Sequence, residues 1–517
     1  MMQIPRFWRR HALLWAVLSA HALLWGAINL IISPHPDTID HWVQSRIFSL
    51  GYQEHPPVIA WLLRGLTSVL GSSEASLEIG AQAVNLAILA LTYALARSAF
   101  GGLAAVLSVL FLEATLYFSA GSTVLQIDQP LMLCWLASLW CLLAYQRTRD
   151  VRWLILMGLC AGLGGISKYT MVLFYLGLAV AITIVPALRR EWLNPFQYLG
   201  GLTALLVVSP HLLWNSRVDW VSVRHQLGKA APDASAFPGQ FSLEFTLGYV
   251  LLFSLPLIAW GLTVMPRALK RQARSDGPVA WLLWISLTPL AFFTLALLRG
   301  SFADPKWANV SFLGLYILLG KAAADLWKAG GRNRVRNILV GAHSLNFALI
   351  ALVLWHVIRP FAPIPAEKDP THHLIGWRET VSEAESLLRG AGVSPPEYVV
   401  SLFYPLAAEF SLRLSSQPLT HSLERPWRNL WSPLDRLNES NTVIVCEFDC
   451  DRQAQRIRDR TGLNFQYLGQ AAAPALGLVR HRVSLYRVTG RVADWIPPER
   501  RPPPDVAIPA VNPAIRP

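Results

Sequence analysis

Long uninterrupted runs of apolar residues constrain this chain more than any other feature. Spanning a bilayer takes about 20 apolar residues, and the sequence holds about eleven runs near that length. They lie at residues 12–33, 76–96, 102–120, 128–146, 153–167, 170–187, 197–214, 246–266, 278–298, 307–327 and 337–358. The sequence therefore predicts an all-α polytopic bundle of about 11 transmembrane helices.

The composition supports this prediction. Only 15% of the residues are charged, whereas a soluble domain carries about a quarter. The first apolar run exceeds the length of a signal-peptide core, and its only small-x-small triplet, Ala20-His21-Ala22, lies in its middle. We therefore expect this run to remain as a membrane anchor.

The positions of the basic residues predict the orientation. Arg6, Arg9 and Arg10 precede the first run, which predicts a cytoplasmic N-terminus. Alternate turns are also basic, and an odd number of spans would then put the C-terminal region outside. The net charge of +13 is thus mostly a topology signal. Nucleic-acid binding is not expected, because the basic residues form no cluster on a soluble domain.

Three parts are predicted along the chain. Residues 1–358 form the bundle, with external loops at 34–75 and 215–245. Residues 359–490 have the composition of a soluble domain. Residues 491–517 are proline-rich and are predicted to be disordered.

Alternating elements predict a small α/β domain in residues 359–490. It contains no glycine-rich phosphate loop and no nucleophile elbow, so a structural or acceptor-docking role is expected. The expected helices are 376–391, Ala407–Arg413 and Arg452–Thr461, and the expected strands are Glu397–Phe403, Thr442–Phe448 and Val483–Val488.

The five cysteines have different expected roles. Cys134, Cys141 and Cys160 lie in apolar runs and are expected only to pack. Cys446 and Cys450 lie in the external part, where an oxidising compartment permits a disulfide. Two free thiols or a metal site are the alternatives for this pair.

The first external loop is expected to contain a helix lying in the membrane interface. Ile39, Trp42, Val43, Ile47 and Leu50 fall near one helical face. Such a helix would present its polar residues to the external water.

Chemistry in a membrane enzyme needs water, so the candidate residues are the polar ones on the external side. Asp37 and Asp128 each open a predicted helix. Aspartate is a preferred helix cap, which is the simple structural interpretation. A helix N-terminus also favours the ionised carboxylate, which suits a general base or an electrostatic stabiliser.

Two other segments stand out on the external side. Glu54 and His55 precede Pro56-Pro57, which forms a stiff corner, although this could be ordinary turn chemistry. Lys168 lies between two apolar runs, where a lysine either extends to the interface or binds an anion.

Taken in order, these stretches resemble the polyprenyl-phosphate-sugar glycosyltransferases of the protein O-mannosyltransferase and aminoarabinose (lipid A) transferase type, which have the GT-C fold. Asp37 resembles the family's first external aspartate, and Gly51–Pro57 resembles Gly-Tyr-x-Asp-His-Pro-Pro with the same spacing. The other similar stretches are Ile127–Leu131, Ile166–Tyr169, Pro210, Trp214, Asn215, Trp220, Ser222, Gln226, Trp307, Gly376-Trp377 and Tyr404–Ala408.

The chain departs from the family pattern at three places. Thr38 stands where the family usually has a second acidic residue, Asp40 where aminoarabinose transferases have an arginine, and His55 where they have a lysine. The phosphate ligands must therefore be sought elsewhere, and the remaining candidates are Lys168, Arg224 and Lys306.

The resemblance implies an inverting transfer of a sugar from a polyprenyl phosphate to an acceptor hydroxyl on the periplasmic face. Asp37 would be the catalytic base, and Asp128, the second catalytic residue, would support the donor or the developing positive charge. Glu54 and His225 would be a candidate pair of ligands for a divalent metal ion. The supporting loop residues would be Tyr52, His55, Trp214, Asn215 and Gln226.

The expected acceptor is a lipid A or lipopolysaccharide-type glycolipid in a bacterial inner membrane. The alternatives are a protein O-mannosyltransferase, a transporter or flippase for a lipid-linked sugar, and a receptor or scaffold. A transporter usually places ionisable residues at mid-membrane depth, whereas here the polar candidates gather at the external side.

Overall fold

The computed structural model describes residues 11–230, 240–270, 272–275, 277–299, 304–422, 441–461 and 464–489. The predicted tail 491–517 lies outside the described residues, as do Arg6, Arg9 and Arg10 and part of the second external loop.

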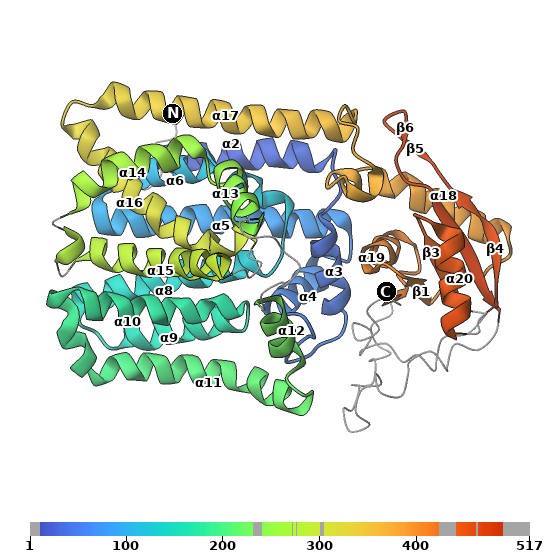
Figure 1. Cartoon of the computed structure of the whole chain (residues 1–517), viewed down its shortest axis with the longest axis horizontal. Coiled ribbons are helices and arrows are strands. Elements are labelled where there is room, and N and C mark those ends of the chain that lie inside the picture. Colours follow the sequence, from blue (N-terminus) through green and yellow to red (C-terminus); the bar gives the residue numbers. More distant parts are fainter. Residues whose placement is uncertain are drawn as a thin grey trace, which may run out of the picture.

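A bundle of helices accounts for most of the described chain (Figure 1). Each predicted apolar run forms a helix or a bent pair of helices. The bundle helices are α2 (Ala12–Asn29), α5 (Glu74–Phe100), α6 (Gly102–Glu113), α7 (Leu116–Ser119), α8 (Asp128–Thr148), α9 (Arg152–Gly165), α10 (Val172–Ile184), α11 (Pro195–Arg217), α13 (Gln240–Leu252), α14 (Leu255–Leu269), α15 (Pro278–Leu298), α16 (Asn309–Lys328) and α17 (Arg332–Ile358).

Six helices of the described chain are long and apolar enough to cross a membrane, and the number rises to nine if three bent pairs each count as one span. The bends reach 90°, 118° and 93°, at the ends of α6, α10 and α13. Helix α9 has only 14 residues, which is short for a span at 1.5 Å rise per residue. The structure thus supports a bundle with several apolar spans rather than a particular count of eleven.

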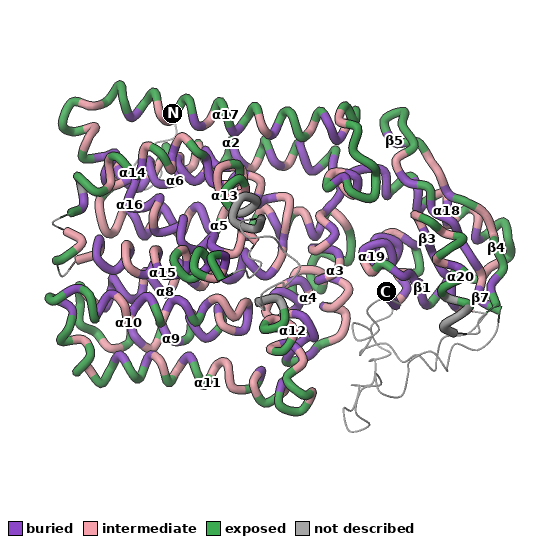
Figure 2. The backbone as a smooth tube through the Cα atoms, in the orientation of Figure 1, coloured by how far each residue is buried: buried purple, intermediate pink, exposed green. Residues whose placement is uncertain are grey.

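The outer helices expose their apolar residues, while the inner helices bury theirs. Only 17% of the apolar stretch of α17 and 22% of that of α11 is buried, against 72% for α16. Figure 2 shows the same contrast between exposed outer helices and a buried centre. Leucines exposed along helices in this way are suited to contact with lipid.

The first external loop forms two helices instead of the one expected. Helix α3 (Pro36–Ser45) ends before Leu50, and α4 (Val58–Leu70) begins directly after the double proline. The prediction that one helical face continues through Ile47 and Leu50 is therefore wrong, because both residues lie beyond the end of α3. The predicted second external loop contains a further helix, α12 (Val221–Ala230).

The C-terminal part contains a five-stranded sheet in the order β2-β1-β3-β7-β4. Strand β1 pairs in parallel with β2 and β3, and β7 is antiparallel to β3 and β4. The strands are β1 (Tyr398–Ser401), β2 (Leu419–Ser422), β3 (Thr442–Cys446), β4 (Asn464–Ala471) and β7 (Val483–Thr489), with a small hairpin of β5 (Pro474–Ala475) and β6 (Leu478–Val479).

Helices cover both faces of this sheet. Helices α18 (Trp377–Gly390) and α19 (Tyr404–Arg413) share one core with alternate residues of β1, β3 and β7. Helix α20 (Cys450–Thr461) packs on the opposite face. The helices and the three buried strands match the sequence predictions, whereas β2 and β4 were missed because they lie at the sheet edges and β4 alternates irregularly between exposed and buried residues.

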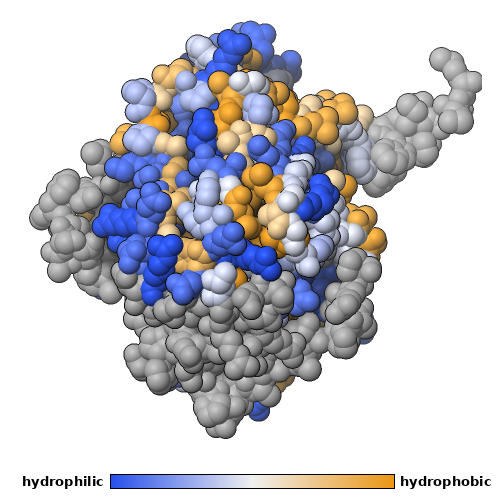
Figure 3. All heavy atoms as spheres, turned by 90° about the vertical axis from the view of Figure 1, so that its right-hand side faces the viewer, coloured by the Kyte–Doolittle hydropathy of each residue, from blue (hydrophilic) through white to orange (hydrophobic). Residues whose placement is uncertain are grey.

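The C-terminal sheet region packs against α3, and Figure 1 shows α3 and α4 between the bundle and α19. The Arg46 guanidinium donates hydrogen bonds to Ser411 Oγ at 3.2 Å and to the Pro418 carbonyl at 2.9 Å. Arg378 and Arg413 both form ion pairs with Glu74 of α5. The end of the molecule opposite the bundle has many hydrophilic residues on its described surface (Figure 3).

The structure joins Cys446 and Cys450 in a disulfide. This outcome selects one of the three alternatives that the sequence leaves open for the pair. Cys134, Cys141 and Cys160 are free.

Candidate active site

Asp37 lies in the first turn of α3, but it does not cap that helix. The N-cap is His35, whose ring Nδ1 accepts a hydrogen bond from the Asp37 backbone N–H at 3.2 Å. Burial lowers the pKa of His35, and the charges of Lys306 and His41 add to this against the opposing effect of Asp37. A neutral ring can serve as this acceptor. The Asp37 side chain is 35% exposed, so water and a substrate can reach its carboxylate.

Asp128 lies at the first residue of α8 and is buried. The Lys168 ammonium lies 2.7 Å from Asp128 Oδ1. Asn309 Nδ2 donates to the same oxygen at 2.6 Å and also contacts Tyr117 Oη at 2.7 Å. The helix-cap interpretation of Asp128 is therefore wrong, because α8 has no side-chain cap and the carboxylate faces two donors from other segments. Lys168 does not extend into the interface, since its side chain is only 13% exposed.

Lys306 is a positively charged residue close enough to feel the charge of both aspartates. It lies on the turn Pro305–Ala308 before α16, with Nζ 3.5 Å from Asp304 Oδ2. Its ammonium also interacts electrostatically with Asp128 and Asp37. The side chain is 34% exposed. Three of the predicted site residues, Asp37, Asp128 and Lys306, thus share one electrostatic neighbourhood.

Hydrogen bonds between loops hold this neighbourhood together. The Leu125 backbone N–H donates to Thr38 Oγ1 at 2.9 Å, which ties α3 to the segment before α8. Ser167 Oγ donates to the Ile127 carbonyl at 2.9 Å and so holds the Lys168 segment beside Asp128. Thr38, which departs from the family pattern, therefore has a structural role next to Asp37.

The Gly51–Pro57 corner packs against the end of α11. A Cβ atom on Gly51 would lie 2.2 Å from the Trp214 ring, so only glycine fits there. The Leu50 carbonyl contacts His211 Nδ1 at 2.9 Å. The corner and the Trp214-Asn215 segment, distant in sequence, are thus one structural unit.

A second set of contacts extends this unit to α12. Tyr169 Oη lies 2.7 Å from His211 Nε2 and 2.5 Å from Ser222 Oγ, and Ser222 donates to Asn215 Oδ1 at 2.9 Å. Gln226 Nε2 donates to the Glu54 carbonyl at 2.7 Å. The predicted supporting residues Asn215 and Gln226 are therefore positioning residues for the corner.

The other residues of the corner also have contacts. Tyr52 Oη donates to the Ile47 carbonyl at 2.6 Å, and burial raises the pKa of this phenol, so it stays a neutral donor. The His55 carbonyl accepts from the Tyr52 N–H at 3.2 Å, and the His55 ring meets His41 edge-on at 5.6 Å.

Arg224 and the predicted metal pair are less closely joined to the aspartates. Arg224 pairs with Asp219, and both side chains are largely exposed. Glu54 is buried, and the bond from Gln226 holds the segment of His225 against that of Glu54. In the described ranges the only cluster of three metal-ligand side chains is a different one, His372, Glu447 and His481.

Four residues at this site were missed by the sequence reasoning, namely His35, Tyr117, His211 and Asn309. Asn309 had a usable signal, since it opens a helix three residues after Lys306. The other three lie among apolar residues or beside a proline, where one sequence gives no reason to separate a ligand from a packed side chain.

A large apolar cavity lies within the bundle, with Lys270 and Arg274 at one end and Tyr249 near the other. It has a volume of about 1130 Å³, and α14, α15 and α16 supply most of its lining. Tyr249 and Phe312 line it. Gly248, next to Tyr249 in α13, packs directly against Pro305, so the Tyr249 end of the cavity lies near the turn that carries Lys306. The combination suits an amphipathic ligand with a long apolar part and an anionic head.

Comparison with known proteins gives matches over most of the chain. The model of the dolichyl-phosphate-mannose-protein mannosyltransferase family matches residues 54–214. A lipid A galacturonosyltransferase, RgtD of Rhizobium johnstonii, is 25% identical over 390 residues, which is 72% of this chain and 77% of the relative. The undecaprenyl phosphate-alpha-4-amino-4-deoxy-L-arabinose arabinosyl transferase of Pseudomonas aeruginosa is 27% identical over 349 residues, 63% of this chain and 60% of that protein.

The fold matches a solved structure over almost its whole length. ArnT from Cupriavidus metallidurans in the apo state has a TM-score of 0.63 at 16% identity, covering 94% of this chain and 99% of that one. The same protein bound to undecaprenyl phosphate matches equally well, with a TM-score of 0.63. At this identity the similarity shows the shared fold.

Proposed function

We propose that this chain, a GT-C glycosyltransferase of the polyprenyl-phosphate-sugar family, moves a sugar from a polyprenyl phosphate to a hydroxyl of a lipid A or lipopolysaccharide-type glycolipid. The family and the enzyme class are as the sequence predicted. The observation that carries the site assignment is the buried Asp128, whose carboxylate meets Lys168 at 2.7 Å and Asn309 at 2.6 Å, three residues after Lys306.

In the proposed reaction the acceptor oxygen attacks the anomeric carbon from the face opposite the phosphate. The bond between that carbon and the phosphate oxygen breaks, and its electron pair leaves with the phosphate. Asp37 takes the proton of the acceptor hydroxyl, a role for which its partial exposure is suited. The configuration at the anomeric carbon is inverted.

The leaving phosphate gains negative charge, which a preorganised cation stabilises. Lys306 is the better placed of the candidates, because it is partly exposed and its turn packs against Gly248, next to the cavity residue Tyr249. Lys168 adds positive charge next to Asp128, which holds it in place. In this proposal Asp128 is a positioning carboxylate that orients Lys168, and Arg224 contributes less because it is exposed and paired with Asp219.

The apolar cavity is the proposed site of the prenyl chain. Its walls are mainly leucine, isoleucine and aromatic residues, which would bury the chain at about 25 cal/mol for each Å² of apolar surface. The phosphate would then lie at the border of the cavity, near Lys306.

Glu54 and His225 are proposed as a pair of ligands for a divalent metal ion, which would supply further positive charge near the phosphate. The buried carboxylate of Glu54 and the contact of its segment with Gln226 support this assignment. Turnover that stays unchanged after exhaustive chelation would remove the pair from this role.

The proposed topology has eleven spans, a cytoplasmic N-terminus and a periplasmic C-terminal domain, in a bacterial inner membrane. The proposed parts are a bundle at 1–358, an external domain at 359–490 and a tail at 491–517. Two observations support them: the basic residues of alternate turns, and the position of the aspartates at the end of the bundle that faces the C-terminal sheet region.

We infer the class of acceptor and the candidate sugars from the activities that the names of the relatives give. The experiment uses detergent-purified full-length protein, polyprenyl-phosphate galacturonate or aminoarabinose as donor, and purified lipid A as acceptor, with mass spectrometry of the product. We expect lipid A to gain the mass of one sugar. A serine-rich peptide as acceptor tests protein O-glycosylation, and transfer to the peptide but not to lipid A would overturn the proposed acceptor.

A further inference from the structure

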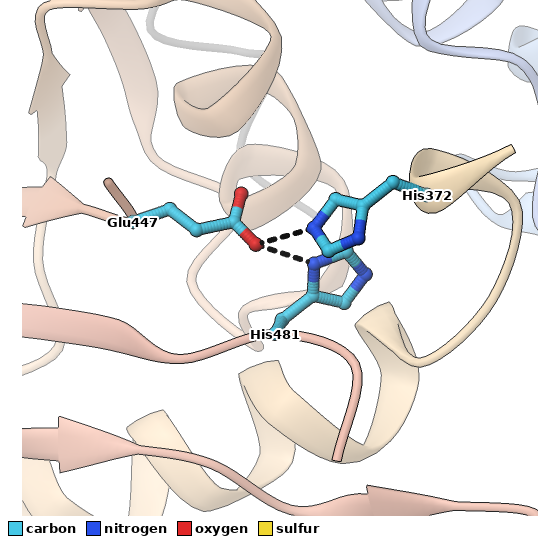
Figure 4. A group of neighbouring side chains, drawn as sticks. All are labelled: His372, Glu447 and His481. Atoms are coloured by element: carbon cyan, nitrogen blue, oxygen red, sulfur yellow. Dashed lines mark hydrogen bonds and ion pairs between the residues drawn. The ribbon is translucent and has the colours of Figure 1, made fainter. Parts of the chain in front are cut away.

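A second cluster of chemically active side chains lies in the C-terminal sheet region, apart from the proposed transferase site. His372 comes from the turn His372–Leu374, Glu447 follows β3, and His481 precedes β7. Figure 4 shows both histidine rings facing the Glu447 carboxylate. His372 Nε2 lies 2.8 Å and His481 Nδ1 2.7 Å from the same oxygen, Glu447 Oε1. The exposed fractions of the His372, Glu447 and His481 side chains are 4%, 6% and 0%, so the cluster is buried from bulk solvent.

The protonation of His481 indicates that the cluster is built for a cation. His481 Nε2 lies 2.9 Å from the Ile375 carbonyl, which can only accept a hydrogen bond, so this nitrogen carries a proton. If the His481 ring is neutral, Nδ1 then carries no proton, and its lone pair points at the carboxylate oxygen Glu447 Oε1. Two acceptors at 2.7 Å repel each other unless a cation lies between them. That cation is either a proton or a metal ion.

The ligand set favours a metal ion of the zinc class. Two imidazoles and one carboxylate match a known zinc ligand set, whereas calcium and magnesium prefer all-oxygen sites. The bond from His481 to the Ile375 carbonyl is the kind of contact that fixes the tautomer of a metal-bound histidine. The Trp377 ring stacks on His481 with centroids 3.6 Å apart and restricts the imidazole further.

The cluster lies where the sheet region meets the bundle. The Leu374 carbonyl, two residues after His372, accepts from the Ser33 backbone N–H at 2.7 Å. Ile375 packs with Trp25 and Ile32 at the end of α2. Ser33 is four residues before Asp37, so the segment that carries His372 is hydrogen-bonded to the stretch that leads into α3.

We propose that His372, Glu447 and His481 form a structural site for one divalent metal ion of the zinc class, which holds the C-terminal sheet region against the segment leading to Asp37. The site supplies three protein ligands, and a water molecule completes the coordination. This site is separate from Glu54 and His225, and it does not depend on the identity of the sugar or the acceptor.

The test measures metal binding on the full-length protein in detergent, without any activity assay. The wild type is stripped with a chelator, dialysed, and titrated with Zn²⁺ alone, and bound zinc is counted by atomic absorption while the melting temperature (Tm) is recorded. We expect Glu447→Gln to bind one zinc ion fewer than the wild type and to lose the rise in Tm that zinc produces. His343→Gln, a histidine variant in α17, is the matched control and should bind as the wild type does.

Two outcomes would overturn the proposal. One is a wild type that binds no zinc after stripping, which would mean that a proton bridges the cluster. The other is zinc that Glu447→Gln keeps and Glu54→Gln loses, which would assign the metal to the Glu54 and His225 pair. If Glu447→Gln does not fold, crystals of the wild type soaked in Zn²⁺ decide: an anomalous peak at the zinc edge between the three side chains supports the site, and its absence rejects it.

Discussion

The Lys168 ammonium lies 2.7 Å from Asp128 Oδ1, although Asp128 begins α8 and Lys168 follows α9, 40 positions along the chain. Asn309 donates to the same oxygen at 2.6 Å. The bond from Ser167 to the Ile127 carbonyl fixes the two backbones beside each other. This ion pair sets the position of one of the two cations proposed to meet the leaving phosphate.

The Asp128–Lys168 pair is expected to be strongly coupled. Asp128→Asn leaves a mostly buried ammonium without its partner, and removing one member of a buried pair costs about 3–5 kcal/mol. The double variant Asp128→Asn/Lys168→Gln should be more stable than the sum of the two single effects predicts. The Tm of the detergent-solubilised protein measures this. Lys321→Gln, which breaks a more exposed pair with Asp325, is the control and should cost at most about 1 kcal/mol. Additive single effects would contradict the coupling.

Asp37→Asn is expected to abolish sugar transfer without unfolding the protein. The variant keeps the size of the side chain but cannot accept the acceptor proton, and losing a general base costs about 10²–10⁴-fold in rate. Its partial exposure means that little packing is lost. Turnover and Tm are measured together. Asp40→Asn, on the same helix with its carboxylate bonded to Gln44, is the matched control and should retain most of the activity. Full activity in Asp37→Asn would reject the assignment.

Lys306→Gln is expected to weaken donor use more than Arg224→Gln does. Lys306 is only 34% exposed and its turn packs against Gly248, next to the cavity residue Tyr249, whereas Arg224 is largely exposed and paired with Asp219. We expect kcat/KM for the donor to fall by about 100-fold or more in the first variant, the scale on which a charge-stabilising donor acts. In the second the fall should be less than about threefold, as for an exposed ion pair. Equal effects of the two substitutions would count against the choice of Lys306.

Gly51→Ala is expected to disturb the corner through a steric clash. The new methyl group would lie 2.2 Å from the Trp214 ring, and overpacking of this kind costs about 1–3 kcal/mol. Gly51→Ala/Trp214→Leu should recover part of the loss in Tm, because the smaller side chain makes room. Gly65→Ala on α4, where the added atom has no neighbour within 4 Å, is the control and should not lower Tm. A Gly51→Ala variant as stable as the wild type would show that the Trp214 ring moves freely.

His421 is expected to make the protein sensitive to acid. It is fully buried in β2, its ring nitrogens have no hydrogen-bond partner in the described part of the chain, and burial lowers its pKa to about 3. The unfolded chain has a histidine pKa of about 6.5, so it binds the proton first as the pH falls. The stability due to neutral His421 is therefore complete above pH 6.5 and falls by about 1.4 kcal/mol per pH unit between 6.5 and 3.

The effect of His421 is measured as the difference in Tm between the wild type and His421→Phe as a function of pH. Between pH 6.5 and pH 4.5 the Tm of His421→Phe should fall less than the Tm of the wild type. Parallel curves for the two proteins over this range would exclude His421 as the source.

The sequence predicted most of the secondary structure, because the signals involved are local. Runs of apolar residues such as 337–358 became helices, since apolar length needs no tertiary information. Helix α18 and the buried strands β1 and β3 were found for the same reason. The bends after α6, α10 and α13 were not found, because the sequence keeps its apolar character through each bend. The edge strands β2 and β4 carry too little periodicity to be recognised.

The sequence also identified several residues of the proposed site, but it did not show which residues contact them. Asp37, Asp128 and Lys306 were chosen because they are polar residues beside apolar runs and match motifs of the family. What the aspartates do was open between a helix cap and a catalytic role. The structure excludes the helix cap for Asp128, whose carboxylate meets Lys168 and Asn309 instead of its own helix. His372, Glu447 and His481, from three distant segments, had no sequence signal at all.

The sequence by itself determined that the chain forms apolar helices, that helices begin at or next to Asp37 and Asp128, and which known family its motifs resemble. These features depend on composition, spacing and order along the chain. Only the tertiary structure decided which charges meet, that Gly51 must be glycine because of Trp214, and that two histidines converge on Glu447. The physical reason is that hydrogen bonds and ion pairs act over about 3 Å, a distance that the folded chain sets between residues far apart in sequence.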